Sequence, residues 1–386
     1  MRLPVFALLC AVVGGVAALG IGRASGLLGG SRTTTTVLVR PAGTTVTVRT
    51  AAQASSFSAA AVFAKRSAGV VTVFAYFGGA GSQGSGFVVA RDGTVLTSAH
   101  VITNAGETTG SVRAASTVYV EFADRDRVAA TVVGWDVFDD VGVLRVDPAL
   151  HALEPLPLGR SAAVVVGEPV AAIGSPLGNA DSLAVGVVSA VGRSIASFTA
   201  PDFQLSDAIQ TDAPIAHGSS GGPLLDAAGR VIGISAQIRS DQGGATGIGF
   251  AVPVDAARRS LRQLLTKGHR AYAFAGLQAE DLTPSLARHL RLAVQRGALV
   301  DHVTAGGPAD RAGLRGGTTQ ESFLGESIVA GGDVVLAIDG RPVTGADDLV
   351  RIVTNRLKPG DTARVLIVRD GRRRTLSIRL ISRPAR

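Results

Sequence analysis

The chain has 386 residues, of which 46% are hydrophobic and 18% charged, and its 38 Lys and Arg against 30 Asp and Glu give a formal charge of +8 at pH 7. This length predicts two or three domains, each with enough apolar residues for a core. Only 4% of the residues are aromatic and the densest basic run is Arg372-Arg373-Arg374, so the composition argues against a nucleic-acid-binding module. The single cysteine, Cys10, excludes an intrachain disulfide.

An apolar stretch lies near the N-terminus. Residues 3–22 carry no charge and lie between Arg2 and Arg23. Twenty helical residues are about 30 Å long, enough to cross a bilayer. Ala18-Leu19-Gly20 fits a signal-peptide cleavage site only loosely, so a transmembrane anchor over residues 1–23 is favoured over a cleaved signal peptide. We expect a single-pass membrane protein with its domains on the extracytoplasmic side, or a secreted protein if the segment is cleaved.

A polar segment follows the apolar stretch. Residues 24–56 are rich in Thr, Ser and Gly, and contain few large apolar side chains. Such a segment buries too little apolar surface to offset the entropy cost of ordering it. We therefore predict a flexible linker over residues 24–56.

From residue 70 to residue 253, short strand patterns alternate with glycine-rich turns. The patterns cover residues 70–74, 86–89, 117–120, 141–146, 187–191 and 231–234. Strands at this spacing without long helices between them are typical of β-sandwiches and barrels. The region is long enough to favour two barrels over one.

One glycine-rich segment matches a cofactor-binding pattern. Residues 79–84 read G-x-G-x-x-G, which in a dinucleotide-binding fold precedes a helix that binds pyrophosphate. Here another strand pattern follows, at residues 86–89. The segment is therefore predicted to be a hairpin tip, and no cofactor is expected.

Residues suited to nucleophilic catalysis occur at three separate places. His100 follows a strand pattern, Asp139-Asp140 precedes another, and Gly218-Ser219-Ser220-Gly221-Gly222 forms a glycine-flanked turn. A serine hydroxyl is a weak nucleophile until an imidazole removes its proton, and a carboxylate keeps that imidazole in the required tautomer. Glycines beside the serine let two backbone N–H groups point at an oxyanion.

Each of these places has an ordinary structural explanation when it is taken alone. A histidine after a strand is commonly a core or turn residue, an aspartate at a strand start caps a turn, and a Gly-Ser stretch is often a loop. However, the order His, Asp, Ser is that of the chymotrypsin arrangement, and it differs from those of subtilisin and the α/β-hydrolases. The combination favours a catalytic set over three unrelated features.

The sequence around these places resembles the HtrA/Deg family of trypsin-like serine proteases over about residues 57–383. The resemblance rests on TDAPIAHGSSGGPLL at 211–225, TSAHV around His100, DDVGVLRV around Asp140, GSPLG at 174–178 and GIGFAVP at 247–253. It implies a chymotrypsin-like double β-barrel over residues 57–268, with His100 as general base, Asp140 as its orienting residue and Ser220 as nucleophile. The backbone N–H groups of Gly218 and Ser220 would form the oxyanion hole.

Three neighbouring residues offer alternatives within this resemblance. The family places its aspartate directly before the aliphatic run and its nucleophile directly before Gly-Gly-Pro, which favours Asp140 over Asp139 and Ser220 over Ser219. His217 stands where the family usually has proline. It is interpreted as structural, because proximity in sequence does not place a side chain near the hydroxyl.

Specificity is partly readable from the same region. A trypsin-type pocket has its acid six residues before the nucleophile, and Pro214 stands there. Asp212 is close by, but the family has an aspartate there without basic specificity. With Ile234, Ser235 and Ala236 as wall residues, we expect a small apolar pocket for Val, Ala or similar side chains.

After a predicted helix at residues 254–267, the segment 272–383 resembles a single PDZ domain. The resemblance rests on GLQA at 276–279, GALV at 297–300 and GDVVLAIDG at 332–340, with an insertion at 316–330. PDZ domains add a peptide C-terminus as an extra strand and bind its carboxylate through N–H groups of a glycine-containing loop. Here that loop would be Phe274-Ala275-Gly276-Leu277. The alternative is that this domain mainly spaces or gates the protease domain and does not select substrates.

Two functions follow from these patterns. The favoured one is a serine endopeptidase that hydrolyses unfolded or damaged extracytoplasmic proteins, is regulated by C-terminal peptides bound to the PDZ domain and, by resemblance, is a homo-oligomer, at least a trimer. The alternative is a non-catalytic peptide-binding sensor or holdase on a protease scaffold, which the intact set of His100, Asp140 and Ser220 disfavours. The six histidines lie far apart without an H-E-x-x-H or CxxC pattern, so no metal is expected.

Overall fold

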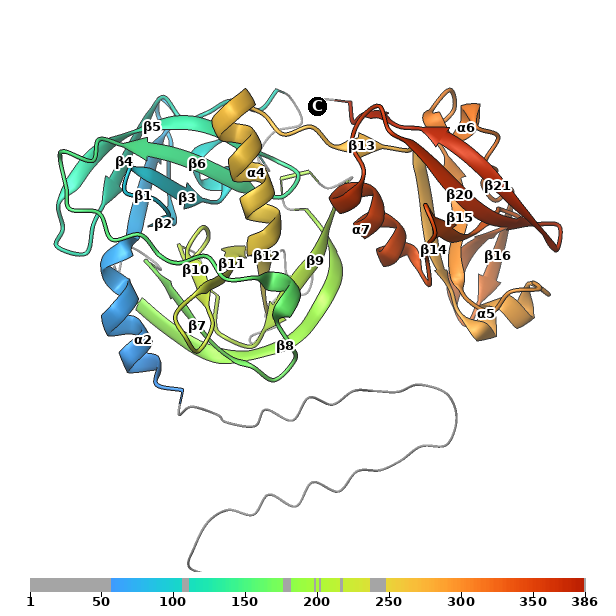
Figure 1. Ribbon diagram of the computed structural model, residues 1–386, viewed down its shortest axis with the longest axis horizontal. Helices are drawn as coiled ribbons and strands as arrows, with labels where there is room; N and C mark the ends of the chain where they lie inside the picture. Colours follow the sequence, from blue (N-terminus) through green and yellow to red (C-terminus); the bar gives the residue numbers. More distant parts are fainter. Residues whose placement is uncertain are drawn as a thin grey trace, which may run out of the picture. The chain divides into compact units, whose positions relative to one another are not determined.

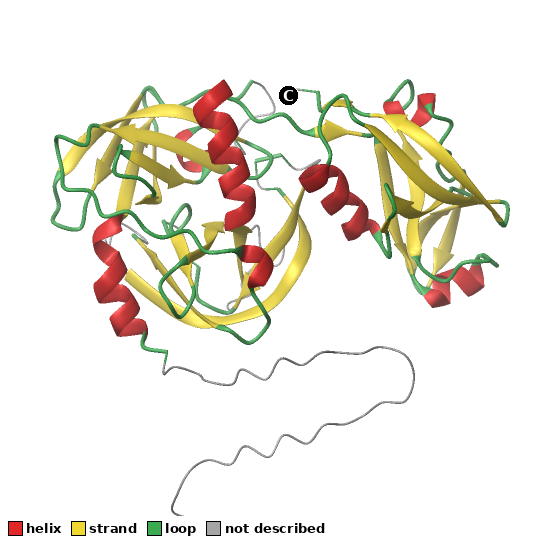
Figure 2. Ribbon diagram, viewed as in Figure 1, coloured by secondary structure: helices red, strands yellow, loops and turns green. Residues whose placement is uncertain are grey.

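The computed structural model describes residues 57–105, 111–175, 182–197, 199–200, 203–215, 218–236 and 248–384. The predicted anchor (residues 1–23) and linker (residues 24–56) lie outside these ranges. Within them, no helix combines the length and apolar character that crossing a bilayer requires. Strands dominate the described elements (Figure 2), as the predicted mainly β fold requires.

The first closed barrel follows a short helix, α2 (Ala59–Arg66), and the 3-10 turn η1 (Ser67–Gly69). Its strands close in the order β1-β2-β3-β6-β5-β4 (Figure 1). Val73 and Leu144 are fully buried in the core of this barrel, whereas Phe87 is buried in the core shared with the second barrel. The strands are β1 (Val70–Tyr76), β2 (Gly81–Val88), β3 (Thr94–Thr97), β4 (Thr117–Glu121), β5 (Arg127–Asp136) and β6 (Val141–Val146).

The second closed barrel contains the other half of the serine-protease motifs. Its strands close in the order β10-β11-β12-β9-β8-β7. They are β7 (Pro169–Gly174), β8 (Ser182–Ala196), β9 (Gln204–Thr211), β10 (Pro223–Leu225), β11 (Val231–Ala236) and β12 (Gly249–Pro253). A 3-10 turn, η2 (Ser161–Ala163), lies on the connection between the barrels. Two closed barrels are therefore present, as the length of the strand-rich region predicted.

Helix α4 (Val254–Lys267) packs on both barrels, against β5 and β6 of the first and β11 and β12 of the second. Its buried side includes Ala257 and Leu264, which join the core shared by the two barrels. The helix ends at Gly268, whose φ of 71° is the left-handed conformation that glycine adopts most easily. Its bounds are those predicted from the sequence.

The C-terminal region forms a second core around a twisted sheet in the order β14-β15-β18-β20-β21, with β19 paired to β18. Strand β14 lies at one edge of this sheet (Figure 1). The insertion at residues 316–330 contains the hairpin β16–β17. The elements are β13 (Ala273–Phe274), β14 (Leu277–Leu282), α5 (Pro284–His289), β15 (Gly297–Val303), α6 (Pro308–Arg311), β16 (Thr319–Phe323), β17 (Glu326–Ala330), β18 (Val334–Ile338), β19 (Arg341–Pro342), α7 (Ala346–Arg356), β20 (Thr362–Arg369), β21 (Arg372–Arg379) and β22 (Ile381–Ser382).

The glycine-rich stretch at residues 79–84 differs from its prediction as a hairpin tip. Strand β2 begins at Gly81, so most of the stretch is paired with β1. A Cβ atom at Gly84 would lie 2.5 Å from Cγ2 of Val101 and 3.0 Å from the carbonyl oxygen of Ser220. The presence of glycine at position 84 is therefore explained by close packing against other elements, and not by a bend in the backbone.

Candidate active site

His100 is placed by the short helix α3 (Ala99–Ile102), which follows β3 directly. The hydroxyl of Thr103 donates to the carbonyl of Ala99 at 2.7 Å and closes this single turn. The helix sits tightly on β6, because a Cβ atom at Gly142 would lie 2.7 Å from Cδ1 of Ile102. The histidine side chain is thus fixed on a rigid part of the first barrel.

Asp140 makes two hydrogen bonds with His100. Nδ1 of His100 lies 2.8 Å from Oδ2 of Asp140, and the backbone N–H of His100 donates to Oδ1 at 3.0 Å. The neighbouring Asp139 points elsewhere and pairs with Arg270. Of the two adjacent aspartates, Asp140 is therefore the one that contacts the histidine.

The electrostatic surroundings of His100 favour its charged form. Burial disfavours the imidazolium, but the charge of Asp140 and its hydrogen bond outweigh burial and raise the pKa of His100 above its usual value. Asp140 lies in a left-handed backbone conformation, with φ of 51°, just before β6. A carboxylate that binds the N–H at Nδ1 leaves Nε2 as the basic nitrogen of the neutral ring.

The turn that contains Ser220 is bound to both barrels. The N–H of Ser85 in β2 donates to the carbonyl of Ser220 at 2.8 Å, and the hydroxyl of Ser85 donates to the carbonyl of Gly218 at 2.6 Å. On the other side, the N–H of Gly221 donates to the carbonyl of Ser235 in β11 at 2.9 Å. Gly218 and Gly221 have φ of 91° and 87°, which glycine tolerates and other residues rarely adopt.

This turn lies against the segment that leads into His100. A Cβ atom at Gly221 would lie 2.5 Å from Oγ1 of Thr97 and 2.8 Å from the backbone nitrogen of Ser98. The hydroxyl of Ser220 is buried, and it has no hydrogen-bond partner among the described residues. The hydrogen bond from Ser220 to His100 that the resemblance implies is therefore not formed in this conformation. Catalytic hydrogen bonds are often long before substrate binds.

The two N–H groups expected to bind an oxyanion belong to Gly218 and Ser220. Both lie in the turn just described, and neither donates a hydrogen bond within the described part of the chain. Ser219 is the neighbour of Ser220, and its carbonyl accepts from the N–H of Gly222 at 3.0 Å. The turn is thus closed by a hydrogen bond within its own backbone.

The residues expected to form the specificity pocket lie close to this turn. Ser235, in β11, exchanges backbone hydrogen bonds with the turn, because its N–H donates to Gly222 at 2.8 Å. Asp212 accepts a hydrogen bond from the backbone N–H of Val187 at 2.6 Å. Its carboxylate therefore has a structural partner. His217 and residues 176–178 and 247 lie outside the described residues.

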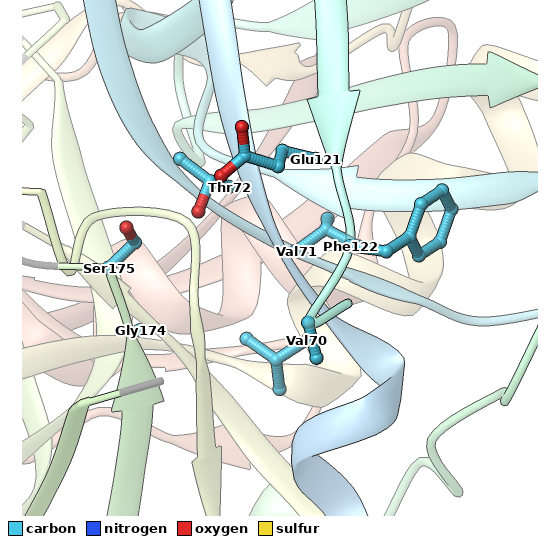
Figure 3. A pocket seen from close by; sticks show the side chains of 8 residues that line it. Val70, Val71, Thr72, Glu121, Phe122, Gly174 and Ser175 are labelled. Atoms are coloured by element: carbon cyan, nitrogen blue, oxygen red, sulfur yellow. The ribbon is translucent and has the colours of Figure 1, made fainter. Parts of the chain in front are cut away.

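A small hollow borders the same region where the two barrels meet. Figure 3 shows Thr72 and Glu121 next to each other, with Ser175 on a neighbouring segment. The backbone N–H of Ser175 donates to Oγ of Ser85 at 2.9 Å, which connects the hollow to the turn of Ser220. Neither His100 nor Asp140 lines it.

Two contributions were missed by the sequence interpretation. Ser85 bridges Gly218 and Ser175, and Arg270 neutralises Asp139 beside the candidate triad. The Gly84-Ser85-Gly86 pattern was a usable signal for close packing, whereas nothing local in the sequence marked Arg270. Among the described residues, no group of three or more possible metal ligands is present.

The predicted PDZ loop lies between β13 and the edge strand β14. Gly276 has φ of 73°, and its carbonyl accepts from the N–H of Thr304 at 2.9 Å. Beside this loop, an apolar pocket extends between β14 and α7. Its lining residues are Ala275, Leu277, Val335, Ile338, Leu349, Val353, Leu357, Ala363, Val365, Ile378 and Leu380.

Two domain families match the chain in the regions just described. Residues 84–234 match the trypsin-like peptidase domain, and residues 273–380 match the PDZ domain. The chain therefore contains a trypsin-like peptidase domain followed by a PDZ domain.

Solved structures define the family more closely. The HtrA-type protease AlgW with tripeptide superposes with a TM-score of 0.70 at 31% identity, covering 85% of this chain and 98% of AlgW. The serine endoprotease from Yersinia pestis gives a TM-score of 0.60 at 25% identity over 85% of this chain and 98% of its own. The chain belongs to the HtrA family.

Curated relatives agree with this assignment. A probable periplasmic serine endoprotease DegP-like from Pseudomonas fluorescens is 36% identical over 297 residues, which are 77% of this chain and 56% of the relative. Protease Do-like 1, chloroplastic, from Arabidopsis thaliana is 37% identical over 303 residues, 78% of this chain and 64% of the relative. The chain thus spans less than two thirds of the length of these relatives.

Proposed function

We propose that the chain is a serine endopeptidase in which His100 is the general base, Asp140 orients it and Ser220 is the nucleophile. The observation that carries the proposal is the pair of hydrogen bonds from His100 to Asp140. Beside it lies a glycine-flanked turn whose buried serine hydroxyl has no hydrogen-bond partner among the described residues. His100 takes the proton of Ser220 as the hydroxyl attacks the scissile carbonyl, and returns it to the leaving amine.

The charge that develops on the carbonyl oxygen is stabilised by the N–H groups of Gly218 and Ser220. Fixed backbone donors aimed at an oxyanion are commonly worth 10² to 10³ in rate. The hydrogen bonds from Ser85 to both residues support this role, because they fix the turn before substrate arrives. The small apolar specificity pocket would be walled by Ile234, Ser235 and Ala236.

The PDZ domain is proposed to bind C-terminal peptides and to regulate the protease. The unpaired edge of β14, the loop Phe274-Ala275-Gly276-Leu277 and the apolar pocket beside α7 support strand addition by a peptide. Helix α7 also contacts the protease domain, because Asn355 donates to Asp207 at 3.0 Å and to Ser206 at 3.2 Å. A peptide that moves α7 would therefore act on strand β9.

We further propose the setting in which this activity operates. The domain division is 1–23 for a transmembrane anchor, 24–56 for a flexible linker, 57–268 for the protease and 272–383 for the PDZ domain. The relatives described as periplasmic endoproteases support an extracytoplasmic location. Unfolded or damaged proteins are the proposed substrates, and a homo-oligomer, a trimer by family resemblance, is the proposed assembly.

Labelling with a fluorophosphonate probe tests the triad directly. The full-length chain should be labelled, whereas Ser220→Ala and His100→Ala should lose labelling. Ser219→Ala is the matched control for the nucleophile and His217→Ala for the base, and both should be labelled. Labelling that persists in Ser220→Ala would contradict the assignment, and an unlabelled wild-type chain, with or without C-terminal peptides, would favour the non-catalytic sensor.

A further inference from the structure

A buried ionic cluster lies beside the proposed triad without being part of it. Arg270 donates from Nη1 to Oδ2 of Asp139 and, at 2.8 Å, to Oγ of Ser260, and the same nitrogen lies 3.4 Å from Oδ2 of Asp136. The side chains of Arg270, Asp139 and Asp136 are only 3%, 2% and 1% exposed. Buried carboxylates need such a partner, because an unpaired charge inside a protein is strongly unfavourable.

The cluster fixes the turn that leads into Asp140. Oδ1 of Asp136 accepts from the backbone N–H groups of Phe138 at 3.0 Å and Asp139 at 3.3 Å. The carbonyl of Val137 accepts from the hydroxyl of Ser197 at 3.3 Å. Asp140 itself has φ of 51°, a left-handed conformation that aspartate adopts more readily than most side chains but that still depends on the hydrogen bonds of its turn.

The partners of this turn come from the segment that joins helix α4 to the PDZ domain. Tyr272 donates its hydroxyl to Oδ2 of Asp136 at 2.6 Å, and its ring centroid lies 4.9 Å from that of Phe138. Arg270 precedes Tyr272 by two residues, and β13, the first PDZ strand, starts at Ala273. Burial, and then the nearby Asp136, raise the pKa of Tyr272, so its hydroxyl stays a donor.

We propose that Arg270 is a positioning residue for catalysis: by holding Asp139 in this buried cluster, it fixes the backbone of Asp140 so that both carboxylate oxygens reach His100. Arg270 touches neither substrate nor the reacting atoms. The inference rests on the proposed function, because it requires a triad that uses Asp140. It also makes the segment between α4 and β13 a direct connection from the PDZ domain to the catalytic carboxylate.

Substitution Arg270→Met in the full-length chain removes the charge and keeps much of the side-chain volume. With Asp140 displaced, we expect kcat for a peptide substrate to fall about 10- to 100-fold while KM stays near the wild-type value. His100 would also lose the carboxylate that raises its pKa, so the acid limb of the kcat/KM profile should move to lower pH. Arg270→Lys should restore part of kcat and move the acid limb back.

Two further variants separate positioning from folding. Asp139→Asn combined with Arg270→Met removes one charge of each sign and leaves Asp136 with its hydrogen bonds from Ser260 and Tyr272. This chain should therefore be more stable than Arg270→Met alone, and it should still show the lowered kcat and the shifted acid limb. Arg369→Met breaks another nearly buried ion pair, with Asp333 at 2.6 Å in the PDZ domain, and serves as the matched control. It should lower the unfolding temperature without moving the acid limb.

The outcomes distinguish this inference from the proposed function. The positioning role would be refuted if the folded Arg270→Met chain, or the double variant, kept the wild-type kcat and the wild-type acid limb. The proposed triad would still be supported in that case if the probe labelled Ser220. A wild-type chain that the fluorophosphonate probe cannot label overturns both. A lowered kcat with an unmoved acid limb also counts against positioning, since a general loss of stability would produce it.

Discussion

His100 and Asp140 are joined by two hydrogen bonds that use both oxygens of one carboxylate. Oδ2 lies 2.8 Å from the ring nitrogen Nδ1, and Oδ1 accepts the backbone N–H of the same histidine at 3.0 Å. A carboxylate bound in this bidentate way orients the ring and the helix turn that carries it together. Replacement of the carboxylate should therefore disturb both the tautomer and the charge of the imidazole.

The first prediction concerns Asp140→Asn. The amide keeps the shape of the side chain but can donate to Nδ1, which favours the wrong tautomer, so kcat should fall about 10⁴-fold. His100 must be neutral to act as base, and its pKa is raised in the wild type, so activity should be lost as pH falls through a midpoint above about 6.5. Asp140→Asn removes the charge that raises the pKa of His100, so the residual activity should extend to lower pH. Steady-state kinetics across pH measure both effects.

Asp139→Asn is the matched control for this prediction, because the two aspartates are adjacent and both are buried. Asp139 contacts Arg270 and not His100, so its direct contribution to the imidazole is smaller. An equal loss of kcat in the two variants, or a greater loss in Asp139→Asn, would contradict the assignment of Asp140.

The second prediction concerns Gly84→Ala. The added Cβ would lie 2.5 Å from Val101 and 3.0 Å from the carbonyl of Ser220, so it must push apart the histidine helix and the nucleophile turn. Overpacking of this kind typically costs about 1–3 kcal/mol of unfolding free energy. A displacement near 1 Å between catalytic groups can lower kcat about 10²-fold. Denaturant unfolding and the fluorophosphonate labelling rate measure the two effects.

Gly79→Ala provides the control within the same stretch. No atom lies within 4 Å of a Cβ placed at Gly79, so both stability and labelling rate should stay at wild-type values. Wild-type labelling in Gly84→Ala would show that the turn of Ser220 does not depend on this close approach.

Local patterns in the sequence predicted a β-rich region and one helix, whereas the chymotrypsin-like barrels and the PDZ domain were expected from the family resemblance. Short apolar runs between glycine-rich turns predicted strands such as β6, and a helical pattern predicted α4 with its bounds, because these features depend on residues a few positions apart. The hairpin tip predicted for residues 79–84 holds for Gly79 and Ala80, whereas Gly81 to Gly84 are paired with β1 and Gly84 packs closely against other elements.

The candidate site was predictable only where a motif marks it. His100, Asp140 and Ser220 stand in motifs that resemble a family, whereas Ser85 and Arg270 act on residues that lie 133 and 131 positions away along the chain. Such contacts arise from the closure of the barrels and the course of the connection after α4. The glycines beside Ser85 indicate close packing but not its partners, and nothing local in the sequence indicates the contacts of Arg270.

The third prediction concerns the residue that precedes the scissile bond. Asp212 is engaged with the N–H of Val187 at 2.6 Å, so it is not a free acid for a lysine or arginine side chain. Peptides with Val or Ala before the scissile bond should be cleaved on the order of 10²-fold faster than those with Lys, measured as kcat/KM over a matched series.

Asp212→Asn tests the reason for this preference. The amide oxygen can still accept from Val187, so the fold should be kept while the negative charge is removed. The preference for Val or Ala should then be unchanged. The prediction would be refuted if the wild type cleaved efficiently after Lys and Asp212→Asn did not. Asp212 would then be the acid that determines specificity.

The last prediction concerns the apolar pocket of the PDZ domain. Val353 of α7 and Leu277 of β14 line it from opposite elements, so Val353→Glu places a charge where an apolar C-terminal side chain would bind. Affinity for a labelled decapeptide with an apolar C-terminal residue should fall at least about 10-fold, measured by fluorescence anisotropy. Leu324→Glu, at a residue that is 84% exposed on the β16–β17 turn, should bind the peptide like the wild type.

Amidation of the peptide's C-terminus should weaken binding as well, because the loop from Phe274 to Leu277 is expected to bind the carboxylate. Equal affinity for the free and amidated peptides would exclude that loop as the carboxylate site, and equal affinity of Val353→Glu and the wild type would place the peptide elsewhere on the domain.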